Sequence, residues 1–438
     1  MESQVLGKTE IYLQLIAKVL EKGKTAIVLV PEISLTPQMV DRFLARFGEN
    51  IAVLHSKLSI GERYDEWQKI KKRQVKIVIG ARSAIFAPVE NLGLIIIDEE
   101  HDMSYKSDTT PRYHAKELAK YIAEKNHCPL ILGSATPDMA DYYEAKETEK
   151  SNLYMLTKRA NDVMLPQIDV VDLRQELVLG NKSMLSFKLQ EEIQKNLDNQ
   201  KQTILFLNRR GYSTFLMCRD CGHVFKCENC NISLTYHKFE NKLKCHYCGF
   251  ETNTPSVCQE CGSRKVKYFG TGTQKLEEEV QKLFPRASTI RMDIDTVTKK
   301  NSHEEILSKF KNEKIDILIG TQMVVKGHHF PDVTLVGAIA ADGILNIEDF
   351  RAPERTFQTL VQVAGRSGRE ESGRVIIQTY NPDHYAIIHS QSQNYEAFYK
   401  TEITLRKMLK YPPFCDIIII KFQGTNIYEL QKAARNSI

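Results

Sequence analysis

Long hydrophobic runs are missing from this sequence. The longest purely aliphatic runs, such as Ile417–Ile420, are far too short to cross a bilayer, which takes about 20 apolar residues. Met1–Glu10 contains no apolar core of signal-peptide length. We therefore expect a cytoplasmic protein with no membrane partner. Because a reducing compartment disfavours structural disulfides, the ten cysteines need another explanation.

A strong charge of either sign is also missing. The sequence has 60 Lys and Arg against 55 Asp and Glu, which leaves a net charge of +5. This small excess permits an anionic partner without identifying one. With 438 residues the chain is too long for one ordinary core, so we expect two or three domains.

What the sequence does have is two series of short runs rich in Ile, Val and Leu, alternating with helix-like stretches. Each run is apolar on both faces, as a parallel strand covered by helices requires. We therefore expect an α/β fold with parallel sheets. The candidate strands are Ala26–Val30, Lys76–Ile79, Leu94–Ile97, Leu130–Leu132, Thr203–Leu207, Ile315–Ile319, Val333–Ile339 and Arg374–Thr379.

Changes in this pattern suggest domain boundaries. The first series ends near Lys158, and a Pro- and charge-rich stretch, Leu165–Lys182, leads into the second. The periodicity disappears between Cys218 and Cys261, which indicates an insertion without a hydrophobic core of its own. The expected organisation is a first domain at 1–160, a linker and start of the second domain at 161–217, a cysteine module at 218–262, the rest of the second domain at 263–381 and a further unit at 382–438.

The cysteine module contains four Cys-x2-Cys pairs. A pair of this spacing presents two thiolates on one side of a tight loop, and four thiolates close a structural Zn²⁺ site. Eight ligands therefore predict two Zn²⁺ ions, and closed coordination leaves no position for a catalytic water. We favour nested pairing over sequential pairing, with one ion on the outer four cysteines and one on the inner four. The outer set is Cys218, Cys221, Cys258 and Cys261, and the inner set is Cys227, Cys230, Cys245 and Cys248.

An apolar strand delivers two carboxylates, Asp98 and Glu99, to its C-terminal end. Ligands bind at this end of the strands in an open α/β sheet. Asp98 would hold Mg²⁺, and Glu99 would orient and polarise the water that attacks a γ-phosphate. A strand that ends in Asp-Glu-x-His is much rarer than an acidic pair alone, which favours this functional interpretation.

Gly7, Lys8 and Thr9 open a helix near the start of the chain. In a phosphate-binding loop the glycine lets backbone amides face the phosphates, the lysine meets the β/γ oxygens and the hydroxyl ligates Mg²⁺. The motif is incomplete here, because Glu2 stands where its first glycine should be and no strand precedes it. Gly-Lys-Thr alone is weak evidence for a phosphate-binding loop, and only the other motifs make this interpretation credible.

Arg366 and Arg369 stand three residues apart in the segment Gln362–Arg369. On a helix they would share a face, from which two guanidinium groups could stabilise the charge of a γ-phosphate across a domain cleft. The alternative is a solvated, glycine-rich helix end.

Taken in order, these motifs resemble superfamily-two helicases with two RecA-like domains, and within them the PriA family of bacterial replication-restart helicases (primosomal protein N′). The cysteine module directly after Asn208–Tyr212 is the specific feature, since most helicases of this superfamily lack it. The matching segments are Gly7–Glu10, Val30–Gln38, Gly80–Phe86, Asp98–Asp102, Gly133–Pro137, Asn208–Tyr212, Gly320–Gly327, Asp349–Ala352 and Gln362–Arg369.

The resemblance implies an ATP- and Mg²⁺-dependent 3′-to-5′ DNA helicase that acts on single-stranded and forked DNA. It implies primosome proteins and single-strand DNA-binding protein as partners, and a role for Gln362 in nucleotide binding. Ser134 and Thr136 would couple hydrolysis to domain motion. Tyr105, Arg112 and Tyr113 would belong to an aromatic-rich loop that senses DNA, with tyrosines stacking on bases. Loop packing is the alternative for these tyrosines.

The sequence departs from the family pattern in several places. His328-His329 stand where the family usually has His-Asp, and the expected N-terminal DNA-binding regions and most of the C-terminal domain are missing. We therefore expect a chain truncated at both ends. This leaves a second hypothesis, a zinc-stabilised DNA- or primosome-binding fragment without effective ATPase activity. A fragment that does not fold stably is a third.

Overall fold

The computed structural model describes the residues 7–32, 35, 37–56, 58–148, 150–156, 165–207, 215–237, 240–268, 272–293, 296, 302–321, 324, 330–367, 373–418, 420, 422 and 426–436. Within them, no helix is long and apolar enough to cross a membrane.

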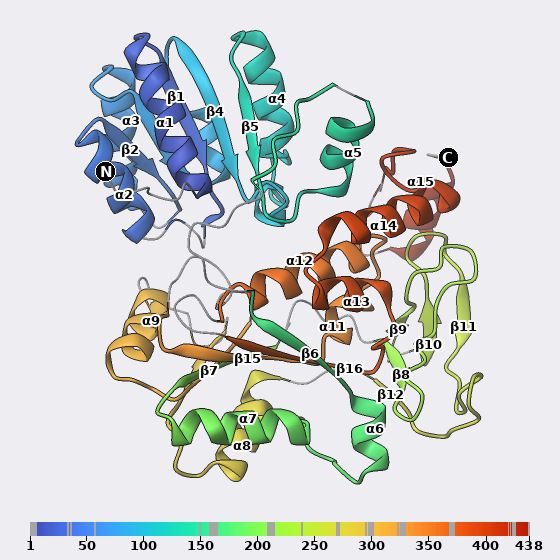
Figure 1. The fold of residues 1–438 in the computed structure, drawn as a ribbon. Helices are drawn as coiled ribbons and strands as arrows, with labels where there is room; N and C mark the ends of the chain where they lie inside the picture. Colours follow the sequence, from blue (N-terminus) through green and yellow to red (C-terminus); the bar gives the residue numbers. More distant parts are fainter. Residues whose placement is uncertain are drawn as a thin grey trace.

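The first domain is a parallel five-stranded sheet with the strand order β2-β3-β1-β4-β5. Its strands are β1 (Thr25–Leu29), β2 (Ile51–Leu54), β3 (Ile77–Gly80), β4 (Leu92–Asp98) and β5 (Leu130–Gly133). The covering helices are α1 (Lys8–Glu21), α2 (Pro37–Phe47), α3 (Ile60–Lys71), α4 (Ala115–Lys125) and α5 (Met139–Glu147), with the short 3₁₀ helices η2 (Arg82–Phe86) and η3 (Met103–Tyr105). Separate hydrophobic clusters fill the two faces of the sheet, so its central strands are apolar on both sides (Figure 1).

The second domain is a parallel six-stranded sheet with the order β13-β14-β7-β15-β16-β6. Its strands are β6 (Gln167–Asp172), β7 (Gln202–Leu207), β13 (Thr289–Met292), β14 (Ile317–Gly320), β15 (Val333–Ile339) and β16 (Arg374–Thr379). The helices around it are α6 (Leu173–Val178), α7 (Phe187–Asp198), α8 (Thr273–Leu283), α9 (Ser302–Asn312), α11 (Asp342–Leu345) and α12 (Ala352–Ala364). Again two clusters of buried side chains fill the opposite faces.

The cysteine module is built from short antiparallel strands beside the second sheet (Figure 1). The strands are β8 (Leu216–Cys218), β9 (Thr235–His237), β10 (Lys242–Lys244), β11 (Glu251–Asn253) and β12 (Val266–Tyr268). β8 pairs with β12, so the two ends of the module return to one place. The chain can therefore leave and rejoin the second domain without disturbing its sheet.

Three helices follow the second sheet: α13 (Tyr385–Gln391), α14 (Tyr395–Leu409) and α15 (Ile427–Arg435). α14 packs with α12 and α13, and its aromatic residues join a cluster that also contains Met139 and Tyr142 of α5 in the first domain. The start of the unit expected at 382–438 thus contacts both sheet domains (Figure 1).

All eight candidate strands are present, with ends shifted by one or two residues at most. β2, β6 and β13 were not expected. The stretch Leu165–Lys182 was interpreted as a lead-in to the second domain, but it contains β6, the edge strand of the sheet, and α6. Its polar residues, such as Asp169 and Asp172, lie on an edge strand that is only partly buried, which conceals the strand pattern.

Candidate functional site

The candidate phosphate-binding residues lie at the carboxyl end of the first sheet. Gly7 precedes α1 with an extended backbone, and Lys8 begins the helix. The Nζ atom of Lys8 lies 2.6 Å from Oε1 of Glu99 and 3.5 Å from Oδ1 of Asp98. Thr9 is half-buried in the same first turn. Gly7, Lys8 and Thr9 therefore share one corner of the structure with the acidic pair, although about 90 residues separate them in sequence.

Asp98 and Glu99 take different positions at the end of β4. Asp98 is the last residue of the strand, and Glu99 follows with a left-handed backbone, φ 47°. This conformation is uncommon for a residue with a side chain and is typical of functional turns. It turns the Glu99 carboxylate toward Lys8.

The two carboxyl groups differ in their electrostatics. Burial raises the pKa of Asp98, although the nearby Lys8 opposes that shift. Burial also acts to raise the pKa of Glu99, but the charges of Lys8, His101 and Arg366 together hold it below its usual value. Glu99 is therefore ionised, as a group that accepts a proton or orients water must be.

Tyr12 is a site residue that motif spacing did not reveal. Its hydroxyl donates a hydrogen bond to Oδ1 of Asp98 at 2.9 Å. Gly133 leaves the room for this ring, because a Cβ atom there would lie 1.7 Å from the Tyr12 oxygen. Tyr12 stands one helical turn after Lys8, so a check of the helix face at i+4 would have found it.

His101 connects the two domains. Its Nδ1 atom lies 2.7 Å from Oγ of Ser134, and its Nε2 atom lies 2.7 Å from Nε2 of Gln362 on α12. Ser134 and Gln362 were assigned separate roles from the sequence, and the structure joins them through this ring.

Arg366 lies just beyond the end of α12, and its charge contributes to the low pKa of Glu99. This places a cation of the second domain in the electrostatic environment of the acidic pair. Arg369 lies outside the described residues.

The expected DNA-sensing residues separate into one buried and two accessible side chains. Tyr105 is fully buried, and its hydroxyl donates to the backbone oxygens of Leu29 at 3.1 Å and Asp98 at 2.6 Å. The stacking role expected for Tyr105 is therefore wrong, and packing is its function in this structure. Arg112 is exposed, and the half-buried Tyr113 makes an edge-to-face contact with Phe86, whose ring is half exposed.

Thr136 is buried in the turn between β5 and α5, where its backbone amide donates to Oγ of Ser134 at 3.0 Å. The backbone oxygen of Thr136 accepts a bond from Nε2 of Gln358 on α12 at 3.3 Å. The proposed coupling segment thus contacts both domains.

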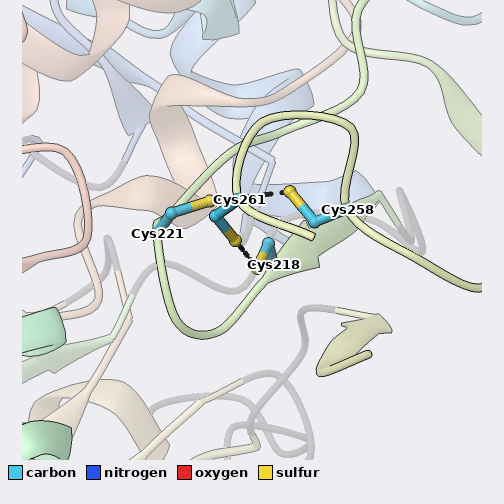
Figure 2. Close-up of side chains that lie close together, drawn as sticks. All are labelled: Cys218, Cys221, Cys258 and Cys261. Atoms are coloured by element: carbon cyan, nitrogen blue, oxygen red, sulfur yellow. Dashed lines mark hydrogen bonds between the residues drawn. The ribbon is translucent and has the colours of Figure 1, made fainter. Parts of the chain in front are cut away.

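The eight paired cysteines form two clusters, and the pairing is nested. Cys218, Cys221, Cys258 and Cys261 form one cluster and Cys227, Cys230, Cys245 and Cys248 the other. Figure 2 shows the outer four side chains converging from two loops. Within each cluster the sulfur atoms lie within 4.8 Å of one another, and closest pairs lie 3.4–3.6 Å apart.

These distances suit a tetrahedral zinc ion. Zn–S bonds of about 2.3 Å imply sulfur separations of about 3.8 Å. Each loop has a left-handed residue after its second cysteine, namely Gly222, Asn231, Gly249 and Gly262. The second of these is asparagine, the residue besides glycine that most readily adopts this conformation. The donor set and the loop geometry therefore support the prediction of two structural zinc sites.

Glu348 attaches the inner cluster to the second domain. Its carboxylate accepts a hydrogen bond from Oγ1 of Thr235 at 2.6 Å and lies 2.8 Å from Nδ1 of His246. Thr235 is on β9, and His246 directly follows the ligand Cys245. Sequence inspection missed Glu348 because it belongs to a loop more than 100 residues away.

Three protein families match consecutive parts of the chain. DEAD/DEAH box helicases match residues 5–145, the PriA DNA helicase Cys-rich region (CRR) domain matches residues 227–252, and the helicase conserved C-terminal domain matches residues 255–371. The two helicase matches fall on the two parallel sheets, and the cysteine-rich match covers the inner cluster. The two sheets are thus the two RecA-like domains of a helicase.

A solved structure supports the fold. The chain is similar to the protein in "Structure of RecG bound to three-way DNA junction", with a TM-score of 0.50 and 14% identity, covering 98% of this chain and 46% of that one. At this identity the similarity concerns the fold alone.

Curated relatives cover nearly all of the chain. The replication restart protein PriA of Bacillus subtilis is 55% identical over 94% of this chain, and that of Synechocystis is 48% identical over 97%. The protein of the same name from Treponema pallidum is 44% identical over 98%. The chain spans about half the length of the Bacillus and Synechocystis relatives, 51% and 52%, and 64% of the Treponema protein. This identity, together with both helicase domains and the Cys-rich region between them, shows that the chain belongs to the PriA family of replication restart helicases.

Proposed function

We propose that this chain is the motor of an ATP-dependent DNA helicase that acts in replication restart. One observation carries the proposal: Glu99, which binds Lys8, lies 3.8 Å from Nδ1 of His101, and His101 contacts Gln362 of the second domain. The charge of Arg366, also of the second domain, acts on the same carboxylate. A nucleotide bound at this boundary would be contacted from both domains. Its hydrolysis would therefore change the contacts that link the two domains.

The residues present fit ATP with Mg²⁺. Lys8 and the first turn of α1 would bind the phosphates, and Thr9 with Asp98 would hold the cation, which neutralises charge on the phosphate oxygens when bound. Glu99 would orient the attacking water, and Arg366 with Arg369 would stabilise the charge of the transferred phosphoryl group. Gln362 would add a contact from the second domain.

The DNA strand would cross the first domain near Arg112 and Tyr113. The exposed Arg112 can meet phosphate, and the Phe86–Tyr113 pair presents an aromatic edge for bases. Family membership supports single-stranded and forked DNA as substrates, 3′-to-5′ movement and a cytoplasmic location. It also supports primosome proteins and single-strand DNA-binding protein as partners.

The test is ATP hydrolysis by the purified chain with and without single-stranded DNA. We expect hydrolysis that DNA accelerates and that Glu99→Gln abolishes while ATP binding persists. DNA binding without any ATP binding would instead favour the zinc-stabilised binding fragment.

A further inference from the structure

Two neighbouring backbone amides at the start of α5 are bound by buried glutamates from different domains. The amide of Asp138 donates to Oε1 of Glu100 at 2.7 Å, and the amide of Met139 donates to Oε1 of Glu354 at 2.8 Å. Glu100 belongs to the first domain, and Glu354 is on α12 of the second. The turn that contains Ser134, Thr136 and Asp138 is therefore held from both sides.

On the side of the first domain, Glu100 directly follows Glu99. Its Oε2 atom accepts a hydrogen bond from Nζ of Lys116 at 3.0 Å, and Lys116 also contacts Asp141 of α5. Glu100 and Lys116 are both buried. The turn is thus linked within the first domain to the strand end that presents Asp98 and Glu99.

On the side of the second domain, Glu354 is paired with Arg406 of α14. The Nη2 atom of Arg406 lies 2.7 Å from Oε2 of Glu354, and its Nε atom lies 2.8 Å from Oε1 of Glu402. Only 3% of Glu354 and 4% of Arg406 is exposed. Oε1 of Glu354 therefore accepts from the Met139 amide and, at 3.4 Å, from Nε2 of Gln358, while Oε2 binds Arg406 of α14.

Further contacts from α12 and α14 reach the same turn. Nε2 of Gln358, one helical turn after Glu354, lies 3.3 Å from the backbone oxygen of Thr136, and the hydroxyl of Tyr395 donates to the backbone oxygen of Pro137 at 2.9 Å. Tyr395 belongs to α14 and stacks edge-to-face on Tyr142 of α5. A rotation of the second domain against the first would have to break these contacts or move the turn with it.

We propose that Glu354, fixed by Arg406, is a positioning residue that ties the turn Ser134–Met139 to the second domain and thereby sets how strongly DNA accelerates ATP hydrolysis. This inference rests on the proposed function. Among the described residues, the hydrogen-bond partners of Glu354 are Met139, Gln358 and Arg406, none of which is a candidate nucleotide-binding residue. Glu354 acts through the turn, whose Ser134 is bonded to His101 and whose Asp138 is bonded to Glu100 beside Glu99.

Glu402 provides a matched control. It is buried like Glu354 and binds the same guanidinium, but its contacts are with Arg406 and Tyr385, both outside the first domain. Glu354→Met and Glu402→Met therefore each remove one carboxylate from Arg406, while only Glu354→Met removes the acceptor for the Met139 amide. Gel filtration and thermal unfolding establish that each variant is folded.

The measurement is the ratio of DNA-stimulated to basal ATPase activity, which does not change when part of a preparation is inactive. We expect Glu354→Met to lower this ratio about fivefold or more, within the usual range of coupling between sites, and Glu402→Met to change it less than about twofold. An unchanged ratio in Glu354→Met, or an equal loss in both variants, would overturn the proposal. If Glu354→Met does not fold, Glu354→Gln is measured instead. The amide NH₂ of glutamine cannot accept a hydrogen bond, so either the Met139 amide or the Arg406 guanidinium loses its acceptor.

Amide hydrogen exchange of the segment around Met139 gives a second readout that does not depend on catalysis. Exchange should be faster in Glu354→Met than in Glu402→Met or the unsubstituted chain. Equal exchange in all three contradicts the role of Glu354 even if the ATPase is active. Absence of ATPase activity in the unsubstituted chain contradicts the proposed function instead, while the exchange comparison still decides whether Glu354 holds the turn.

Discussion

Lys8 and Glu99 form a close ion pair, with Nζ of the lysine 2.6 Å from Oε1 of the glutamate. In the proposed reaction these two groups have different tasks, since the lysine binds phosphate and the glutamate orients water. A bound γ-phosphate would compete for the ammonium group and release the glutamate carboxylate. The pair thus provides a physical reason why Glu99 would act only when ATP is bound.

The first prediction concerns this pair. Glu99→Gln should lower the rate of ATP hydrolysis about 100-fold or more, the size expected for loss of a positioned proton acceptor, while ATP still binds. Lys8→Ala should weaken ATP binding itself, because it removes the cation that meets the phosphates. Equilibrium binding of a fluorescent ATP analogue and steady-state hydrolysis separate the two effects. Full hydrolysis in Glu99→Gln would show that this residue does not orient the water.

The second prediction concerns the zinc clusters. The purified chain should contain two zinc ions, and Cys261→Ser or Cys248→Ser should each remove one, because each belongs to a different cluster. Cys128→Ser is the control and should retain both ions, since Cys128 belongs to neither cluster. Metal analysis of the three variants measures this. Loss of both ions from each single variant would contradict two independent sites. Because metal binding is coupled to folding, each variant that lacks a ligand should also have a lower melting temperature.

The sequence predicted the central strands of both sheets and the edge strand β5, and it missed the other edge strands, β2, β6 and β13. β4 and β15 are buried on both faces, so their composition alone distinguishes them. β6 and β13 are edge strands with partly exposed side chains, and β2 is the edge strand beside β3. Such segments become recognisable only through the partner strand, which sequence does not reveal.

The same distinction holds for the site. Lys8, Asp98, Glu99 and the cysteine pairs were found because their chemistry depends on short spacing along the chain. Glu354 was not found, because it reaches Met139 across 215 residues and nothing local marks it as buried. Tyr105 was misassigned for the same reason: an aromatic residue between polar neighbours looks exposed until the fold shows the core that surrounds it.

The third prediction concerns pH. Burial, with a further contribution from Lys226, lowers the pKa of His384 to about 4, and its Nδ1 atom caps α13 by accepting the Ala386 amide. The folded state therefore binds fewer protons at His384 than the unfolded chain, whose histidine titrates near pH 6.5. Its contribution to stability is complete above pH 6.5 and is lost as the pH falls toward 4, by on the order of 3 kcal/mol.

His384→Asn isolates this effect, because asparagine caps a helix without titrating. The free energy of unfolding should be similar for the two proteins at pH 7.5 and should fall less steeply in the variant between pH 6.5 and 4.5. Urea unfolding at several pH values measures the difference. Proton-driven loss of zinc affects both proteins equally and cancels in the comparison. Parallel pH profiles would show that folding does not lower the pKa of His384.

The fourth prediction separates a packing tyrosine from a DNA-contacting one. Tyr105→Phe should lower the free energy of unfolding by about 1 kcal/mol, because it removes the hydroxyl that donates to Leu29 and Asp98, and should leave DNA affinity unchanged. Tyr113→Ala should weaken binding of single-stranded DNA by about 1–3 kcal/mol, the usual contribution of a base-stacking ring. It should also lower stability, because the half-buried ring packs against Phe86 and the core of the first domain.

Tyr64→Ala is the matched control, since Tyr64 is an exposed tyrosine on α3, which packs beside β2. Fluorescence anisotropy with a labelled oligonucleotide gives the affinities, and thermal unfolding gives the stabilities. An equal loss of affinity in Tyr64→Ala and Tyr113→Ala would mean that the Phe86–Tyr113 edge is not where the bases bind. A loss of affinity in Tyr105→Phe without any loss of stability would mean that the Tyr105 hydroxyl positions the DNA-binding loop in addition to its packing, because a fully buried ring cannot stack on a base.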